Sequence, residues 1–171
     1  MVRQRPKLGD VFVVPLDDGK FGVGQVVGTY GKESYFFAIF DVVIPLEHAN
    51  RQAVEAVDRP VLFLALSMDA KLYAGHWRVV GQEPVPPEVP LPAYKEAVGS
   101  PPNFEVVDYS GTRRRPATAA EAHTLPNRKV VAPVRVEKAL RAHLGLEPWL
   151  DAFNELRPEG RATTADLFNR R

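Results

Sequence analysis

The stretch GDVFVVPLDDGKFGVGQVVGTYGKESYFFAIFDVVI, residues 9–44, decides the fold of this chain. Residues 11–14 and 21–27 are rich in β-branched and aromatic side chains, which favours two short strands. Between them lies the sequence Asp-Asp-Gly-Lys at residues 17–20. Asp tolerates the left-handed backbone region and Gly enters it freely, so this sequence predicts a tight turn between the two strands.

The second strand contains two glycines, and the third is apolar throughout. Gly22 and Gly24 alternate inside a β pattern, which indicates a bend or a close backbone approach. Residues 35–44 are apolar at both strand parities, so we expect this strand to be covered on both faces. A second apolar run at residues 61–68 has the length of a buried strand, and we expect it beside the first.

The remaining pattern predicts an α+β fold. Its centre is a strongly bent, mainly antiparallel sheet of about six or seven strands, small-barrel-like in the N-terminal half, with peripheral helices and a helical C-terminal segment. We expect Phe12, Phe40, Phe63 and Trp77 to be buried. The further strand predictions are residues 76–80, 104–109 and 129–132, and the helix predictions are 46–57, 118–124, 134–144 and the stretch that follows Pro148.

The predicted organisation has three parts. Residues 1–132 form the bent-sheet domain, and they include a proline-rich strap at 84–102 that packs on the body rather than forming a central strand. Residues 133–160 form a C-terminal helical pair. Residues 161–171 form a polar tail, which is either disordered or capped by Thr164 for one turn.

Composition limits the classes of function. The chain has 171 residues, a formal net charge of +1 and no cysteine, so disulfides, thiolate metal sites and a cysteine nucleophile are excluded. The charged N-terminus lacks the apolar region of a signal peptide, and no apolar run reaches the roughly 20 residues of a membrane helix. We therefore expect a cytoplasmic protein without a membrane partner.

Motifs that carry catalysis are scarce. The four histidines are not at metal-ligand spacing, and the sequence has no nucleotide-binding glycine loop, so we predict no metal and no cofactor. Asp41 interrupts the most apolar strand, and a buried carboxylate there would be a candidate catalytic group. The alternative is that Asp41 lies near the solvent end of the strand. No acid/base pair assembles around it, so we predict that the protein is not an enzyme.

Several segments resemble one known family. GDVFVVPLDDGKFGVGQVVG, AIFDVVIP, PVLFLALSMDAKLYAGHWRVVGQEPVP and LPAYK are similar in order and spacing to the bacterial Immunity protein 26 family, over residues 7–95 and more weakly to about residue 132. The shared residues are Gly9, Asp10, Phe12, Pro15, Gly24, Phe40, Asp41, Phe63, Gly75, Trp77, Gly81, Pro84 and Pro92. The resemblance implies an immunity protein of a polymorphic toxin system, which binds and occludes a cognate toxin without catalysis.

Two candidate surfaces follow. A nuclease toxin would favour an acidic contact surface, for which position and charge suggest Asp17, Asp18, Tyr30, Glu33, Asp58 and Asp69. The alternative is a small-barrel module that binds nucleic acid through a loop containing Arg113, Arg114 and Arg115. The net charge disfavours that partner, and the sequence does not indicate an oligomeric state.

Overall fold

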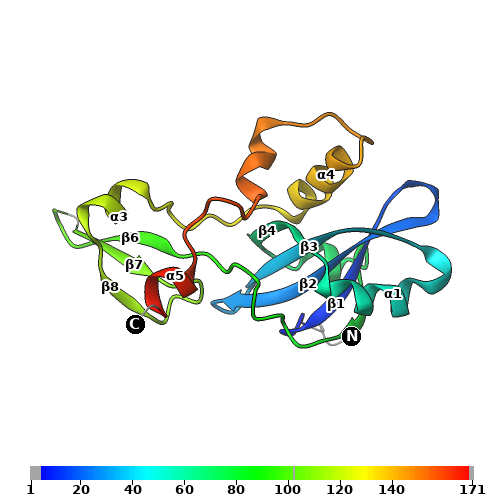
Figure 1. The fold of residues 1–171 in the computed structure, drawn as a ribbon, viewed down its shortest axis with the longest axis horizontal. Helices are drawn as coiled ribbons and strands as arrows, with labels where there is room; N and C mark the ends of the chain where they lie inside the picture. Colours follow the sequence, from blue (N-terminus) through cyan, green and yellow to red (C-terminus); the bar gives the residue numbers. More distant parts are fainter. Residues whose placement is uncertain (1–4, 102, 170–171) are drawn as a thin grey trace.

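The computed structural model describes residues 5–101 and 103–169, which form two antiparallel sheets linked by extended segments (Figure 1). The larger sheet has the order β4-β3-β2-β1-β5, with β1 (Asp10–Pro15), β2 (Lys20–Tyr30), β3 (Ser34–Pro45), β4 (Val61–Ser67) and β5 (Arg78–Gln82). The smaller has the order β6-β7-β8, with β6 (Tyr94–Val98), β7 (Asn103–Val107) and β8 (Arg114–Pro116).

Helices divide between the two sheets. The α-helices are α1 (Ala49–Glu55), α2 (Ala70–Tyr73), α3 (Ala119–Thr124), α4 (Pro133–His143) and α5 (Thr164–Phe168). The 3-10 helices are η1 (Asp17–Gly19), η2 (Leu46–His48), η3 (Ala56–Asp58) and η4 (Asp151–Leu156). We call the five-stranded sheet with α1, α2, α4 and η4 the body, and the three-stranded sheet with α3 and α5 the lobe (Figure 1).

The predicted α+β class is confirmed, with a difference in the sheet. Within the described residues, eight strands form two sheets instead of six or seven in one. Strand β7 pairs antiparallel with β6 and with β8. None of these three strands pairs with a described strand of the body. Pro84–Pro92 separates them from β5, and proline cannot donate to a ladder, so the second sheet begins anew after the prolines.

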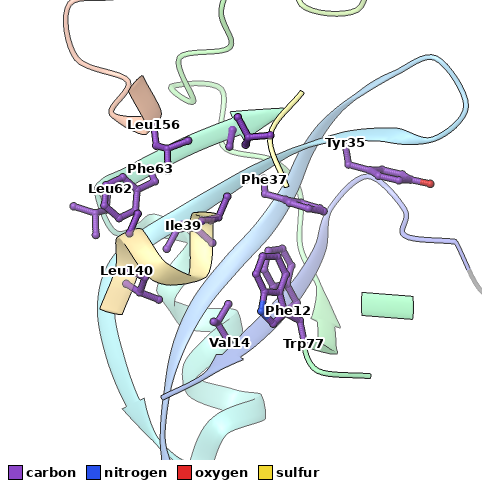
Figure 2. Packing of buried hydrophobic residues seen from close by; sticks show 14 of the residues in the cluster. Phe12, Val14, Tyr35, Phe37, Ile39, Leu62, Phe63, Trp77, Leu140 and Leu156 are labelled. Carbon is purple, nitrogen blue, oxygen red and sulfur yellow. The ribbon is translucent and has the colours of Figure 1, made fainter. Parts of the chain in front are cut away.

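Strand β3 is buried on both faces from Tyr35 to Phe40, as its sequence predicts, whereas Asp41 and Val43 near its end are exposed. Tyr35, Phe37 and Ile39 point into one core cluster, and the alternate residues point into the other. Helix α4 and η4 cover the first face, where Leu140 and Leu156 pack against this cluster (Figure 2). Helix α1 and the proline strap cover the second face. The body is therefore a sheet between two apolar layers, with β4 paired beside β3 as expected.

Gly22 and Gly24 of β2 leave room for large side chains from α4 and β1. A Cβ at Gly22 would lie 2.4 Å from Leu140, and one at Gly24 would lie 2.4 Å from the Phe12 ring. The register between β2 and β3 also shifts between these two glycines. The predicted bend and close approach are confirmed: the missing side chains let α4 and the aromatic core reach the sheet.

Trp77 joins α4 to the sheet. Its ring stacks on Phe12, with centroids 5.3 Å apart, and it is 1 % exposed (Figure 2). Its indole Nε1 donates a hydrogen bond of 2.8 Å to Glu137 of α4, which also pairs with Lys71 at 3.4 Å. The predicted burial of Trp77, Phe12, Phe40 and Phe63 is confirmed.

Three local predictions are wrong. Residues 129–132 are not a strand, because Pro133 begins α4 immediately after them. Val131 O accepts a hydrogen bond from the Ser67 hydroxyl, and Val131 N–H donates one to Leu66 O. The stretch after Pro148 is a 3-10 helix that starts only at Asp151. Arg114 and Arg115 lie in β8 instead of a loop.

The strap and the tail pack on the molecule. Val85, Val89, Leu91 and Tyr94 contact the body core, as predicted, although the proline-free end of the strap forms β6. Residues 163–169 contain a short helix capped by the Thr163 side chain, where Thr164 was expected to be the cap. Thr164 is buried and donates to Pro92 O at 2.7 Å, so the tail ties the strap to the lobe.

Candidate functional site

An open groove of the body lies between the proline strap and the chain that enters β4. Two adjoining hollows of about 640 and 500 Å³ share Val57, Asp58, Pro86 and Glu88 in their walls. The remaining wall includes the prolines at 60, 84, 87, 90 and 158. Proline fixes the backbone φ, so these walls lose little freedom when another molecule binds.

Carboxylates dominate the charge of this groove, which we call the acidic groove. Its acidic residues are Glu55, Asp58, Glu83, Glu88 and Glu159. Among the described residues that line it, Arg59 is the one with a positive charge. Glu55 pairs with Arg51 one helical turn away at 3.1 Å, in an exposed contact that is worth little. The groove thus presents fixed apolar walls under a negative field, which attracts a cationic surface.

The acidic residues predicted from the sequence are dispersed. Asp58 lies in the groove, whereas Asp17 pairs with Arg141 of α4 at 3.0 Å. Asp18 is exposed in the β1–β2 turn with a φ of 60°, and Glu33 is exposed in the β2–β3 turn. These turns lie at opposite ends of β2, roughly 30 Å apart at the rise of a strand. One compact contact surface therefore does not contain them all.

Two further predicted residues are engaged inside the molecule. Asp69 is 5 % exposed, so it offers almost no surface to a partner. It precedes α2, and its backbone oxygen accepts a hydrogen bond from the Tyr73 N–H. The Arg128 guanidinium stacks on Tyr30 at 3.7 Å from the ring centroid. Tyr30 is thus half-buried where the body meets the lobe, and its part in a partner contact stays a prediction.

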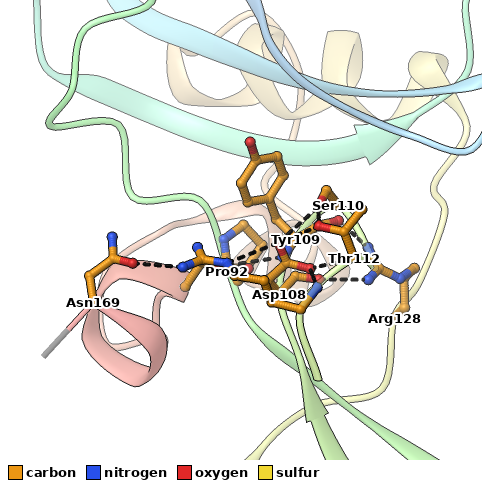
Figure 3. A network of polar contacts seen from close by, with 9 residues as sticks. Pro92, Asp108, Tyr109, Ser110, Thr112, Arg128 and Asn169 are labelled. Carbon is orange, nitrogen blue, oxygen red and sulfur yellow. Dashed lines mark hydrogen bonds and ion pairs between the residues drawn. The ribbon is translucent and has the colours of Figure 1, made fainter. Parts of the chain in front are cut away.

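Arg128 links segments of the body and the lobe. Its guanidinium donates to the backbone oxygens of Tyr109 at 2.6 Å and Asp108 at 3.0 Å (Figure 3). It also stacks on the Tyr94 ring. Burial lowers its pKa, while the fields of Tyr94, Tyr30 and Asp108 oppose that change. Arg128 sits next to Lys129 in the sequence and is indistinguishable there from a surface charge.

All three residues of the arginine run have internal partners. Their polar contacts are Asp108 and Asn169 for Arg113, Glu96 and Glu105 for Arg114, and Glu121 for Arg115. The bidentate bond from Arg115 lowers the pKa of Glu121 to about 2. Phe168 of α5 also packs under Arg113 and Arg115. These cations hold the lobe together, and their charge is largely neutralised there.

Asp108 organises the turn that precedes β8. Burial disfavours its ionised form, but bonds from Ser110 and from the backbone amides of Arg113 and Thr112, with the Arg113 charge, lower its pKa overall (Figure 3). The carboxylate is 2 % exposed. It therefore acts as a buried anionic cap for consecutive backbone donors.

Asp41 lies at the surface, as one of the two sequence interpretations has it. Its side chain is 54 % exposed and its Oδ1 lies 3.2 Å from His143 Nε2 of α4. His143 packs on Phe63, and its own side chain is 29 % exposed. Within residues 5–101 and 103–169, no group of three or more His, Asp or Glu residues is placed to hold a metal ion, and no helix is long and apolar enough to cross a membrane.

The sheet, the strap and the acidic groove define a mixed α+β protein with a preformed surface suited to a protein partner. The family model of Immunity protein 26 matches residues 7–101, which covers more than half of the chain. The chain belongs to the Immunity protein 26 family, and it is thereby an immunity protein of a toxin system. Searches of curated proteins and of solved structures found no significant match.

The matched segment coincides with a particular part of the structure. It contains β1–β5, α1, the strap and β6, and it therefore contains Glu55, Asp58, Glu83 and Glu88 of the groove. The fifth groove carboxylate, Glu159, and helix α4 lie beyond it. Sequence reasoning found only Asp58. For Glu83 and Glu88 the available signal was the pair of glutamates that flanks the prolines of residues 84–87, and this signal does not extend to Glu55 or Glu159.

Proposed function

We propose that this protein neutralises a cognate toxin by binding it stoichiometrically and covering its active surface, without catalysis. Membership of the immunity family over residues 7–101 carries this proposal. The exposed position of Asp41, paired with His143 at the surface, also agrees with a role that needs no buried catalytic carboxylate.

We further propose that the acidic groove is the contact surface and that the toxin presents a basic face, as a nuclease does. Four of its five carboxylates lie in the family-matched segment, and fixed proline walls surround them. Opposite charge accelerates encounter and fixes register, while a rigid surface reduces the entropy that binding costs. A stable complex of this kind buries about 1,600 Å² in total, so the groove would be the centre of a larger contact.

The test uses the toxin domain encoded beside this protein. Co-expression rescue reports neutralisation, and stopped-flow association at low and high salt reports the charge contribution. The groove variant carries Glu55→Gln, Asp58→Asn, Glu83→Gln and Glu88→Gln. The matched control carries Asp18→Asn, Glu33→Gln, Glu47→Gln and Asp151→Asn, four exposed acidic residues outside the groove.

We expect the groove variant to associate about tenfold more slowly at low salt, with little difference at high salt, and to rescue poorly. The control should behave like the native protein. An equal loss of association rate and rescue in both variants would show that net charge alone causes the effect. The groove would then no longer be the proposed contact surface. Failure of the native protein to bind or rescue would refute neutralisation by binding.

A further inference from the structure

A second hollow, distinct in chemistry from the acidic groove, lies beside the outer edge of β4. It has a volume of about 340 Å³, within the range of small-molecule sites. Its apolar lining comes from Phe36, Leu64, Leu66, Val131 and Leu156. The strap, the chain leading into α4, η4 and the tail complete the walls, so four separate segments meet around this cavity.

Tyr94 lines the cavity and is 8 % exposed. In the part of the chain that the structure describes, its hydroxyl makes no hydrogen bond, although Arg128 stacks on its ring. Burial raises the pKa of Tyr94 to about 12, against the opposing fields of Arg128 and Arg161. The hydroxyl therefore keeps its proton at neutral pH and can donate a hydrogen bond to a molecule in the cavity.

Arg161 lines the same cavity from the tail and is half-buried. Its guanidinium makes no hydrogen bond or ion pair with any described residue, whereas Lys129 on the rim is held by Glu155 at 3.0 Å. Arg157, also on the rim, stacks on Trp149 at 4.5 Å. A guanidinium has five hydrogen-bond donors, so Arg161 can donate to an acceptor in the cavity.

We propose that this cavity binds a small organic anion, a carboxylate or a phosphate monoester with a compact apolar body. The anion accepts from the Arg161 guanidinium and the Tyr94 hydroxyl, and its apolar part lies against Leu64, Leu66 and Leu156. Charge-assisted bonds to a guanidinium are about twice as strong as neutral ones, which selects an anion over a neutral molecule. This site shares Glu159 with the acidic groove and is otherwise lined by different residues.

The probes are benzoate and phenyl phosphate, with benzamide as the neutral analogue of benzoate and inorganic phosphate as the anion without an apolar body. Titration of the full-length protein is followed by amide chemical shifts. We expect saturable binding of at least one organic anion, with benzamide and inorganic phosphate each about tenfold weaker. The preferred probe identifies whether the cavity takes a carboxylate or a phosphate.

Three variants test the assignment. Arg161→Gln should weaken the preferred anion about tenfold, and Tyr94→Phe, which keeps the ring, about threefold. Glu159→Gln removes a rim carboxylate whose field acts on Arg161, and should strengthen binding two- to threefold, roughly. A merely structural role for these residues would not produce this opposite sign. The Thr164 amide resonance verifies in each variant that the tail remains packed.

Three results would overturn the proposal. The first is the absence of saturable binding by both organic anions at millimolar concentration. The second is equal affinity for benzoate and benzamide in the native protein. The third is an Arg161→Gln variant with intact tail packing that binds the anion as well as the native chain. Any of them would leave the cavity to water or to a neutral ligand.

Discussion

The body and the lobe are stabilised by different means. The body has two large apolar clusters on either side of its sheet, and its buried polar residues are few. The lobe has a cluster of three fully buried residues, Ala93, Val106 and Leu125, and relies on carboxylate–arginine contacts around Asp108 and Glu121. A body held by apolar burial and a lobe held by charges should respond differently to substitution and to pH.

The largest expected effect is in the body. Trp77→Ala removes a ring that is 1 % exposed and stacked on Phe12, and it leaves Glu137 without its indole donor. We expect a loss of about 3–5 kcal/mol in the free energy of unfolding, because a large cavity opens in the core. Urea denaturation followed by the fluorescence of Trp149 and by circular dichroism measures it.

Trp77→Phe is the matched control for this prediction. It keeps an aromatic ring against Phe12 but loses the bond from Nε1 to Glu137, so its cost should be clearly smaller. A loss below about 1 kcal/mol in Trp77→Ala would show that the core does not depend on this ring.

The second effect should be confined to the lobe. Asp108→Ala leaves the backbone amides of Thr112 and Arg113 and the Ser110 hydroxyl without their acceptor. We expect a local cost of about 2 kcal/mol, seen as roughly 30-fold faster amide hydrogen exchange in β7 with little change in β3.

Ser110→Ala provides the graded comparison, since it removes one donor and keeps the carboxylate. Its cost should stay below about 1 kcal/mol. If Asp108→Ala accelerated exchange in β3 and β7 equally, the lobe and the body would unfold as one cooperative unit, and the distinction between them would lose its energetic meaning.

The sequence revealed the body far better than the lobe. Residues 35–44 are apolar at both strand parities, which predicted the central strand, because periodicity reports burial directly. The apolar run at residues 61–68 predicted its neighbour, and the glycines at 22 and 24 predicted the bend. The second sheet was missed. Its strands are short and half polar, and the contacts that hold them join residues far apart in sequence, such as Arg113 and Asn169.

The candidate site was predicted only in part, because it also depends on contacts between residues far apart in sequence. Asp58 was chosen by charge, but the groove depends on the strap folding back over η3, which brings Glu83 and Glu88 to Asp58. No local pattern encodes that approach. The arginine run is the converse case: three adjacent cations suggest a binding surface in the sequence, and the fold places Glu96, Glu105 and Glu121 beside them.

Acid should loosen the lobe before the body. The pKa of Glu121 in the folded chain is about 2, against an ordinary value of 4.5, and that of Asp108 is also lowered. A lowered pKa means that the stabilisation is present above the ordinary pKa and is lost as pH falls from about 4.5 towards 2. Amide exchange at pH 6 and pH 3, corrected for intrinsic rates, measures this in β7 and β3.

Glu121→Gln isolates one part of this acid response. It should remove the contribution of the Arg115 pair, about 1 kcal/mol or less for a partly exposed contact, and so flatten the pH dependence of the lobe. The lobe of this variant could instead lose as much protection from amide exchange on acidification as the native lobe. In that case protonation of Glu121 would not cause the acid response, and Asp108 would be left as its source.

The smallest effect concerns Asp41, the polar residue that made the apolar third strand look functional. Its carboxylate is 54 % exposed, and its contact with His143 is a surface bond between β3 and α4. We expect Asp41→Asn to change the free energy of unfolding by less than about 0.5 kcal/mol at pH 7, because solvent screens such pairs and the amide oxygen still accepts a hydrogen bond. Urea denaturation and toxin rescue are measured together. A cost above about 2 kcal/mol would place Asp41 among the buried determinants of the body, whereas lost rescue at native stability would move the toxin contact from the groove to the α4 side of the sheet.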